Sequence, residues 1–433
     1  MQKLYSTQFL KKKLFFIFIL CTSSTLFSQT FSDNGINYTV TSATIPLTVE
    51  VASYNDFYGD AIIPSTVTNA SKNYSVTSIG NLAFYTCFGL TSVTIPDSVT
   101  SIGHDAFAGC TGLTSVTIPD SVTSIGYVAF LGCTGLTSVT MPNSLATIEY
   151  GIFKDCNLLA SVTIPSSVTN IEDFAFFGCS SLASVVIPNS VTSIGEYVFS
   201  NCYSLLSVTM PNYLSSIGIG AFYGCSSLTA ITIPESVTSI KDSTFVGCSG
   251  LTSILIPNSV TSIGFFVFGD CTSLTSVSIP SSVTSIGNYA FQSCTGLTSF
   301  TVDWATPLAI PNEVFSNVNL ANVILYVPAG TQSAYLAAPV WQNFGMVTLG
   351  TQDFLNNNNF ETYPNPATNN VTIDLLETDN SDLEVFDFNG KKLLTQKLSN
   401  LSNNINIENL VSGVYIFQVS SNKGSATRKV IKQ

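Results

Sequence analysis

Cysteine is the residue with reactive chemistry that this 433-residue sequence repeats most regularly. Ten cysteines, from Cys87 to Cys294, recur at steps of 23 residues, and none has the CxxC spacing of a zinc site. If every period forms one coil of a stack, equivalent thiols point the same way, which suits a disulfide poorly. We therefore predict a buried column of small, weakly polar side chains, with five disulfide bridges as the alternative.

Two carboxylates share the same spacing. Glu149 and Glu172 occupy a position that holds glycine in other periods, for example Gly103 and Gly126. If neighbouring coils stack at one strand spacing, these two carboxylates would lie about 5 Å apart. This is the separation between the two carboxylates of retaining glycosidases. Neither an aromatic platform nor a loop insertion accompanies them, so we expect a solvated acidic edge. Weak cation binding and catalysis are the alternatives.

The remaining composition argues against an enzyme or a metal site. A single histidine, His104, leaves no His-rich metal site and no reserve of general bases. The net charge is −12, and a chain without a basic cluster outside its N-terminus is a poor nucleic-acid binder. The sequence therefore predicts no catalytic residue, no metal ligand, no cofactor and no nucleic-acid partner.

Aromatic residues gather at two positions of the period, just before a recurring Ala-Phe pair or its equivalent. These positions change between periods, as in His104-Asp105 and Tyr127-Val128, while the frame around them stays constant. Variable positions on a rigid scaffold often form binding surfaces, where aromatic residues are enriched. We predict an acid-flanked aromatic stripe that binds a ligand, with drift at unconstrained turn positions as the alternative. The predicted stripe residues are Tyr127, Tyr150, Phe174, Tyr197, Phe265, Phe266 and Tyr289.

The elements that must position these residues follow from one unit, residues 90–112. Val93 and Ile95 alternate with polar residues, which is typical of a strand with one wet face. Pro96 then removes a backbone donor and ends the ladder. One unit buries too few apolar side chains to fold alone, whereas stacked units share ladders and side-chain contacts. The period therefore predicts a solenoid of about ten coils with a parallel sheet.

Hydroxyl groups line the wet face of the predicted strand. Ser92 and Thr94, with their equivalents at 23-residue steps, would form columns along the sheet. Regular hydroxyl arrays can bind ice, but that needs a flat face, and Val186 and Leu255 interrupt the column. We expect a soluble surface of low charge.

The N-terminus has the order of a secretory signal peptide. Lys11, Lys12 and Lys13 precede an apolar run over residues 14–20, and small polar residues follow up to Ser28. The run is too short to span a bilayer as a permanent helix. We predict a signal peptide over residues 1–28, an exported protein, and no transmembrane segment in the mature chain.

Beyond residue 350 the period stops. Residues 351–360 contain an Asn run and are predicted to be a linker. Residues 361–433 contain short apolar runs such as VTIDL and GVYIFQV between turn residues, which predicts a small antiparallel β-sandwich. The predicted fold class is therefore mainly β, with a solenoid followed by a small sandwich.

The unit resembles the BspA-like type of bacterial leucine-rich repeat, with the pattern LxxVxIPxxVxxIGxxAFxxC, over residues 80–299. Proline after the strand and the lack of an Asn ladder distinguish it from the commonest leucine-rich repeat. The resemblance implies a leucine-rich-repeat solenoid with a β-rich N-terminal cap over residues 29–79 and a degenerate closing repeat over residues 300–350. Both ends need caps because they would otherwise expose the core.

Three motifs of the tail, YPNPA, GVY and the terminal KVIK, resemble a type A sorting domain of the type IX secretion system over residues 361–433. The motif residues are Pro364, Asn365, Pro366, Gly413, Tyr415, Lys429 and Lys432. The resemblance implies a Bacteroidetes-type source, the type IX secretion machinery as a partner, and a protein that is secreted or attached to the outer-membrane surface. An ordinary β-sandwich binding module is the alternative.

These expectations combine into a function. BspA-like proteins include adhesins, so the resemblance implies non-catalytic adhesion or binding, with an extracellular protein or glycan as the ligand. The alternatives are an extracellular polysaccharide-active enzyme, for which substitution of Glu149 and Glu172 is the test, and a structural surface-layer component that assembles without a ligand.

Overall fold

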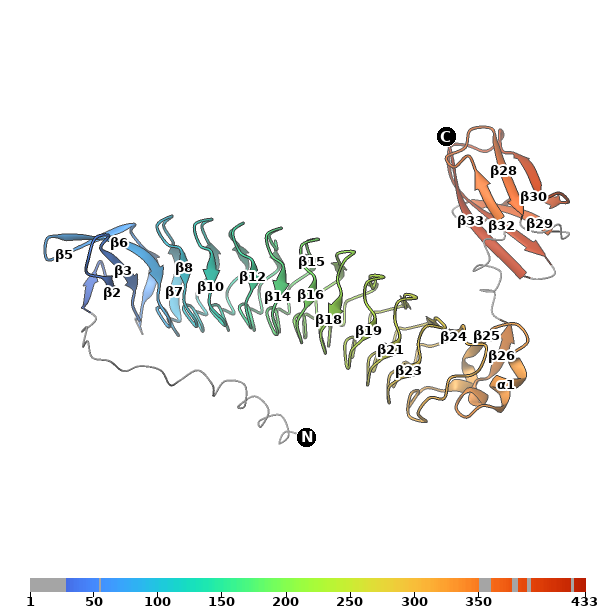
Figure 1. Ribbon diagram of the computed structural model, residues 1–433, viewed down its shortest axis with the longest axis horizontal. Helices are drawn as coiled ribbons and strands as arrows, with labels where there is room; N and C mark the ends of the chain where they lie inside the picture. Colours follow the sequence, from blue (N-terminus) through green and yellow to red (C-terminus); the bar gives the residue numbers. More distant parts are fainter. Residues whose placement is uncertain (1–28, 54–55, 350–359, 376–380, 388–390, 422–423) are drawn as a thin grey trace.

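The computed structural model of the chain describes residues 29–53, 56–349, 360–375, 381–387, 391–421 and 424–433 (Figure 1). The predicted signal peptide, residues 1–28, and the predicted linker, residues 351–360, lie outside these ranges except for Phe360. Figure 1 shows the repeats as coils stacked side by side along the long axis.

Nearly every coil contributes one short strand to a series of parallel sheets along this side; the coil around Ile231 is the exception, because residues 228–234 form no strand. Val93 and most of its equivalents point inward and are buried, Val162 and Val208 only partly, while the flanking residues, mostly serine and threonine, face outward, as the alternation predicts. Neighbouring coils pair in register at 23-residue steps, for example Ser115 with Ser138 and Ser138 with Ser161. These strands are β7 (Gly89–Thr94), β9 (Ser115–Thr117), β11 (Ser138–Thr140), β13 (Ser161–Val162), β15 (Ser184–Val186), β17 (Ser207–Thr209), β20 (Ser253–Leu255), β22 (Ser276–Ile279) and β24 (Ser299–Val302).

A second parallel sheet follows the proline of each coil. The backbone N–H of Val99 donates to the carbonyl of Pro96 at 3.0 Å, which turns the chain, and Ile102 is then buried in a two-residue strand. The sequence pattern described above predicts no strand at this place. The second strands are β8 (Ser101–Ile102), β10 (Ser124–Ile125), β12 (Thr147–Ile148), β14 (Asn170–Ile171), β16 (Ser193–Ile194), β18 (Ser216–Ile217), β19 (Ser239–Ile240), β21 (Ser262–Ile263) and β23 (Ser285–Ile286).

The third side of each coil, which we call the turn edge, runs from the position of Gly103 to the residue before the cysteine. It has no strand, but backbone N–H groups still donate to the next coil, as from Phe107 to the carbonyl of Ala129 at 2.8 Å. Inside it, the phenylalanines from Phe84 to Phe291 form a column of nearly parallel rings with centroids 5.1–5.7 Å apart. Every coil is therefore joined to its neighbours on three sides.

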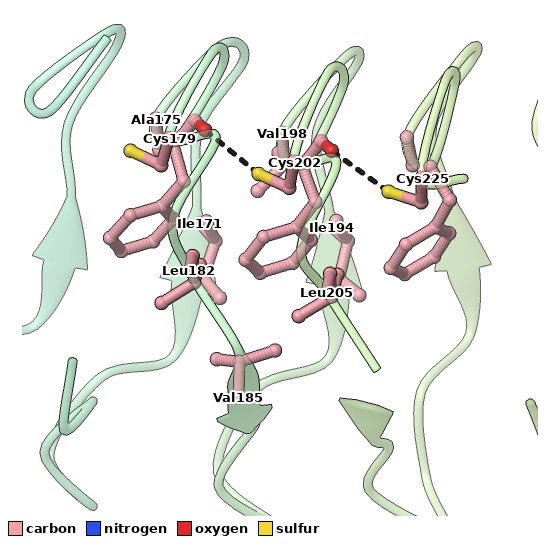
Figure 2. Packing of buried hydrophobic residues seen from close by; sticks show 14 of the residues in the cluster. Ile171, Ala175, Cys179, Leu182, Val185, Ile194, Val198, Cys202, Leu205 and Cys225 are labelled. Carbon is pink, nitrogen blue, oxygen red and sulfur yellow. Dashed lines mark hydrogen bonds between the residues drawn. The ribbon is translucent and has the colours of Figure 1, made fainter. Parts of the chain in front are cut away.

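The cysteine column lies beside the phenylalanine column. All ten cysteines from Cys87 to Cys294 are buried free thiols. Nine of them, from Cys110 onward, donate from Sγ to the carbonyl of the phenylalanine in the preceding coil at 3.0–3.3 Å. Figure 2 shows two of these bonds, from Cys202 and Cys225. The thiols form the column that the period predicts, and burial raises their pKa well above its usual value, as for Cys156.

The N-terminal end is covered by antiparallel strands that merge into the repeats. β1 (Thr30–Asp33), β2 (Ile36–Ser42) and β3 (Thr48–Val51) pair in order, and β3 continues in parallel onto β6 (Lys72–Ile79), which pairs with β8. β5 (Thr66–Asn69) forms a hairpin with β6, and β4 (Tyr58–Ile62) pairs with β7. We propose residues 29–79 as the cap, since Tyr38 and Tyr74 bury their rings there.

The other end of the solenoid is closed by aromatic side chains. The first sheet continues through β25 (Ile324–Val327) to β26 (Met346–Leu349), with η1 (Leu320–Asn322), α1 (Gln332–Ala337) and η2 (Trp341–Asn343) between and beside them. Phe300 packs edge-on against Phe291 at 5.2 Å, and Trp341 is buried behind it. We propose residues 300–350 as the closing cap because Phe315 stacks on Phe291 at 5.5 Å and Phe300 packs edge-on against both rings.

The C-terminal residues form two antiparallel sheets with their own core. One sheet orders β27 (Phe360–Tyr363), β28 (Asn370–Leu375) and β31 (Ser402–Asn406). The other orders β30 (Lys392–Leu398), β29 (Ser381–Asp387), β32 (Gly413–Ser421) and β33 (Gly424–Lys432). The predicted mainly β fold, a solenoid followed by antiparallel sheets, is confirmed. Among the described residues, none of the helices has the length and apolarity needed to cross a membrane.

Candidate binding surface

Each coil places two residues of its turn edge in the left-handed backbone region. The second variable position has a φ between 49° and 61°, for example 60° at Phe174 and 53° at Tyr197. The residue before the cysteine has a φ between 56° and 77°, for example 60° at Asn201. An L-residue with a bulky side chain adopts this region at a cost of about 1–2 kcal/mol, whereas glycine adopts it readily and asparagine and aspartate tolerate it better.

The two left-handed positions are filled by different kinds of residue. Before each cysteine the chain has only glycine or a small polar residue: Thr86, Gly109, Gly132, Asp155, Gly178, Asn201, Gly224, Gly247, Asp270 and Ser293. The second variable position instead holds Leu82, Asp105, Val128, Gly151, Phe174, Tyr197, Gly220, Ser243, Phe266 and Tyr289. Bulky residues thus occur at six of ten coils where the backbone disfavours them. This contrast argues against drift at an unconstrained position, because the position is constrained and the sequence departs from what the constraint favours.

Polar residues at the first variable position have a structural role. Side chains of Asn81 and His104 accept the backbone N–H of the equivalent residue in the next coil, at 2.8 and 3.1 Å. The carboxylates of Asp173 and Asp242 do the same at 2.6 and 2.7 Å. The aromatic rings of Tyr127, Tyr150 and Phe265 replace such an acceptor at the same position. The fold therefore explains the polar residues of this column but not the aromatic ones.

Four rings and one lysine form what we call the central aromatic cluster: Tyr150, Phe174, Phe177, Tyr197 and Lys154. The ring of Phe174 is 5.6 Å from Tyr150, 5.8 Å from Phe177 and 5.3 Å from Tyr197, nearly parallel to the last. The Nζ atom of Lys154 lies 5.2 Å from the Phe177 ring centroid and 5.6 Å from that of Phe174. Sequence reasoning missed Phe177 and Lys154, because they lie outside the two variable positions and join the cluster only when coils stack.

The other predicted stripe residues form two separate groups. Tyr127 stacks on His104 with centroids 3.7 Å apart, and 40% of Tyr127 is exposed. Phe265, Phe266 and Tyr289 contact one another at 5.2–5.7 Å, and 45% of Phe265 is exposed. Two coils with Ile219-Gly220 and Asp242-Ser243 at the variable positions separate this group from the central cluster. The predicted stripe is therefore three patches along one edge.

Acidic residues concentrate on the same edge. Of the eleven acidic residues between positions 80 and 299, eight lie on the turn edge, together with two lysines, Lys154 and Lys241. The eight are Asp105, Glu149, Asp155, Glu172, Asp173, Glu196, Asp242 and Asp270. The turn edge carries most of the charge of the repeats, and the charge is negative.

Burial and neighbouring carboxylates shift the pKa of three groups on this edge, Glu149, Glu196 and Tyr150. Burial, and then the neighbouring Glu172, raise the pKa of Glu149. Burial and Asp173 raise the pKa of Glu196, although Lys241 opposes them. Burial and Asp173 also raise the pKa of Tyr150. A positive charge bound nearby would therefore reduce the electrostatic repulsion between these carboxylates.

One member of the predicted carboxylate pair, Glu149, lines a shallow groove, whereas Glu172 does not. The side chain of Asn170 donates to Glu172 at 2.5 Å, while Glu149 lines the groove. The groove has a volume of about 470 Å³, and Glu50 lies at its other end. Glycines floor it because the coils approach closely: a Cβ on Gly126 would lie 2.5 Å from the backbone nitrogen of His104. Within the described ranges, no three His, Cys, Asp or Glu side chains are grouped as a metal site would need.

The three tail motifs meet at one end of the C-terminal module. Asn365 accepts the backbone N–H of Ile431 at 2.9 Å, and Ala367 donates to the carbonyl of Ile431 at 2.8 Å. Gly413 pairs with Lys432, so GVY lies beside KVIK. The side chain of Tyr415 is buried and donates to the carbonyl of Val411 at 2.7 Å. Pro364 and Pro366 flank Asn365, and Lys429 pairs with Ile416 through the backbone.

Two family profiles match the chain. BspA type leucine rich repeat region matches residues 77–206 and 192–322 in six copies, which together span more than half of the chain. Secretion system C-terminal sorting domain matches residues 361–433. A comparison with curated proteins gives no match.

Solved structures of bacterial leucine-rich repeat proteins are similar to the chain. A leucine-rich repeat protein from Bacteroides ovatus is 27% identical, over 74% of this chain and 100% of that chain, with a TM-score of 0.44. A leucine-rich cell-surface protein from Faecalibacterium prausnitzii is 29% identical, over 63% and 94%, with a TM-score of 0.33. A leucine-rich repeat protein from T. pallidum is 25% identical, over 62% and 91%, with a TM-score of 0.27.

Proposed function

This chain belongs to the BspA-type leucine-rich repeat family, and from that premise we propose that it is a non-catalytic binding protein whose turn edge recognises an extracellular protein or carbohydrate ligand. The type IX sorting domain makes it a secreted or outer-membrane-attached cell-surface protein. Both predicted resemblances, to BspA-like repeats and to the sorting domain, are confirmed. Adhesion is the role that we propose for the surface it displays.

One observation supports the turn edge as the binding surface. Phe174, Tyr197, Phe266 and Tyr289 have left-handed backbone, although the other left-handed position of the same coils uses glycine and small polar residues. Strained backbone tends to persist where function needs the side chain. Rings held partly exposed on a rigid stack are already ordered before a ligand arrives, which reduces the entropy lost on binding.

The test is a binding screen with the full secreted chain against glycans, matrix proteins and cells. The triple variant Tyr150→Ala, Phe174→Asn and Tyr197→Asn removes three rings. Asparagine is used at positions 174 and 197 because it tolerates their left-handed backbone conformation. We expect binding to fall at least about tenfold, as for the loss of interface hot spots. A matched control is Thr117→Ala with Thr140→Ala on the exposed strand face. Unchanged binding in the ring variant would favour drift over a binding surface.

The proposal gives the sorting motifs a separate role. Pro364, Asn365, Pro366, Gly413, Tyr415, Lys429 and Lys432 would act in handling by the type IX secretion machinery. The hydrogen bond from the Ile431 backbone N–H to the Asn365 side chain joins two of the motifs. An Asn365→Ala variant should leave ligand binding by secreted protein unchanged and lower the amount secreted. Measuring the two quantities on the same culture separates export from recognition.

A further inference from the structure

The central aromatic cluster already holds a positive charge. Lys154 places Nζ 5.2 Å from the Phe177 ring and 5.6 Å from the Phe174 ring, within the range of a cation–π contact. The rings of Tyr150 and Tyr197 extend the same surface on either side of Phe174. The chain therefore contains an example of the side chain that this surface accommodates.

On three consecutive coils, a carboxylate residue directly precedes a ring of the cluster in the sequence. Glu149 and Tyr150 are consecutive, Asp173 precedes Phe174, and Glu196 precedes Tyr197. Lys154 is the one basic residue among the turn-edge residues of these three coils. A neutral ligand would use the rings and leave the carboxylates unpaired, whereas a cationic ligand would use both.

The groove extends the acidic surface towards the N-terminal cap. Glu149 lines one end of its 470 Å³ volume and Glu50 lies at the other, across the glycines at positions 80, 103 and 126. Burial raises the pKa of both glutamates, so each carboxylate lacks the stabilisation that a nearby cation gives. An extended chain lying along the solenoid axis would pass from the rings into this groove.

We propose that the turn edge around the central aromatic cluster binds a basic polypeptide segment of a partner protein, with arginine or lysine side chains over the rings and between Glu149, Glu172 and Glu196. The proposal rests on the function proposed above and specifies the chemistry of the partner. Lys154 then acts as an internal competitor, because it occupies the faces of two rings that an incoming side chain would use.

The experiment measures binding of an oligo-arginine peptide to the full secreted chain by calorimetry at low and high salt. The double variant Phe174→Asn with Tyr197→Asn is expected to weaken binding about tenfold through lost cation–π contacts. The double variant Glu149→Gln with Glu196→Gln is expected to weaken binding by a similar factor and to flatten the salt dependence. Lys154→Ala is expected to tighten binding about threefold or more, because it frees the rings.

The matched control removes two acidic residues that lie outside the turn edge, Asp97→Asn with Glu235→Gln. It makes the same change of net charge and is expected to leave binding within about twofold of the parent chain. Equal losses in this control and in the Glu149/Glu196 variant would mean diffuse attraction to an acidic protein and would overturn the proposal. Weaker binding in Lys154→Ala would also overturn it, because the lysine would then support the site instead of competing for it.

A second probe separates failure of this inference from failure of the proposed function. Neutral oligosaccharides are titrated into the same variants. Binding that depends on the rings, ignores the carboxylates and occurs without oligo-arginine binding would refute a basic partner and retain the proposed binding surface. Ring variants that leave every ligand unaffected would refute both. Circular dichroism and thermal melting check that each variant keeps the solenoid.

Discussion

The strand face and the turn edge of the same coils differ in how they use sequence. On the strand face, serine and threonine recur at equivalent positions, and columns such as Thr114, Thr137 and Thr275 donate or accept hydrogen bonds between coils. On the turn edge, two positions vary from coil to coil and carry the aromatic and acidic residues. Both sides hydrogen-bond to the neighbouring coils, but only the turn edge combines this with side chains that differ from coil to coil, which is why we propose it as the binding surface.

The largest expected effect comes from the buried side of the turn edge. It tests whether the phenylalanine column contributes more to stability than the exposed threonines of the strand face. Phe199 is fully buried between Phe176 and Phe222, with ring centroids 5.5 and 5.6 Å away. Phe199→Ala should lower the free energy of unfolding by about 3–5 kcal/mol, because it leaves a cavity in a continuous column. Thr140→Ala on the strand face should change it by less than about 0.5 kcal/mol. Denaturant titration measures both, and equal effects would remove the distinction.

The thiol column gives a prediction at alkaline pH. Burial raises the pKa of Cys294 from 9.0 to about 12. A raised pKa contributes stability that is present below pH 9.0 and is lost as pH rises towards 12, because unfolded thiols ionise first. Stability measured from pH 8 upward should therefore fall, and less steeply in Cys294→Ala. A titration with a thiol reagent should find ten reactive thiols in the denatured mature chain, whereas none would remain if five disulfides existed.

Exchanging residues between the two left-handed positions tests the strain argument. Val128 has a φ of 49°, where a β-branched side chain is strongly disfavoured, and Asn201 has a φ of 60°. Val128→Asn should raise the free energy of unfolding by about 1 kcal/mol, and Asn201→Val should lower it by about 1–2 kcal/mol. Thermal melting reports both signs. If both substitutions changed the free energy of unfolding in the same direction, backbone strain would not explain the difference between the two positions.

The smallest expected effects concern how the stability contribution of one carboxylate depends on pH, with opposite signs for Glu149 on the turn edge and Asp60 beside the strand face. Glu149 on the turn edge has a pKa raised by burial and by Glu172, so it destabilises the folded state at neutral pH. Glu149→Gln should therefore raise stability at pH 7 by well under about 1 kcal/mol, since solvent screens the group, and the gain should vanish as pH falls below 4.5. Asp60 beside the strand face accepts hydrogen bonds from Ser92 and Thr91, which lower its pKa.

The sign for Asp60 is reversed. A lowered pKa contributes stability that is present above 3.8 and is lost as pH falls through the folded value. Asp60→Asn should therefore lower the melting temperature at neutral pH and lose this effect in acid. Melting curves of the two variants between pH 3 and pH 8 compare the faces directly, and parallel curves would contradict the assigned causes.

The regular part of the fold could be predicted from the sequence because the same apolar pattern recurs in every 23-residue unit. Val93 and Ile95 gave the first strand, and the cysteine spacing gave the thiol column, since a fixed step forces equivalent residues into register. The two-residue strand at Ser101 was not predicted, because so short a segment has no alternation to detect. Its hydrogen bonds arise only from the neighbouring coil.

The arrangement of the proposed binding surface was predicted only in outline. The variation between coils singled out Phe174 and Tyr197 as candidate binding residues. Their left-handed backbone could not be predicted, because aromatic residues rarely adopt that conformation. Lys154 and Phe177 meet across a coil boundary, so their contact depends on the stacking distance and on side-chain direction. Local composition specifies neither quantity.

The bond that nine of the ten thiols donate to the phenylalanine carbonyl of the preceding coil bears on how such proteins change over generations. Any coil offers its neighbours the same ring, carbonyl and thiol, as Cys202 and Cys225 illustrate (Figure 2). Duplication or deletion of one 23-residue segment in frame therefore recreates an identical junction on both sides. The gene can lengthen the turn edge, or change which aromatic turns lie next to one another, without redesigning the interior.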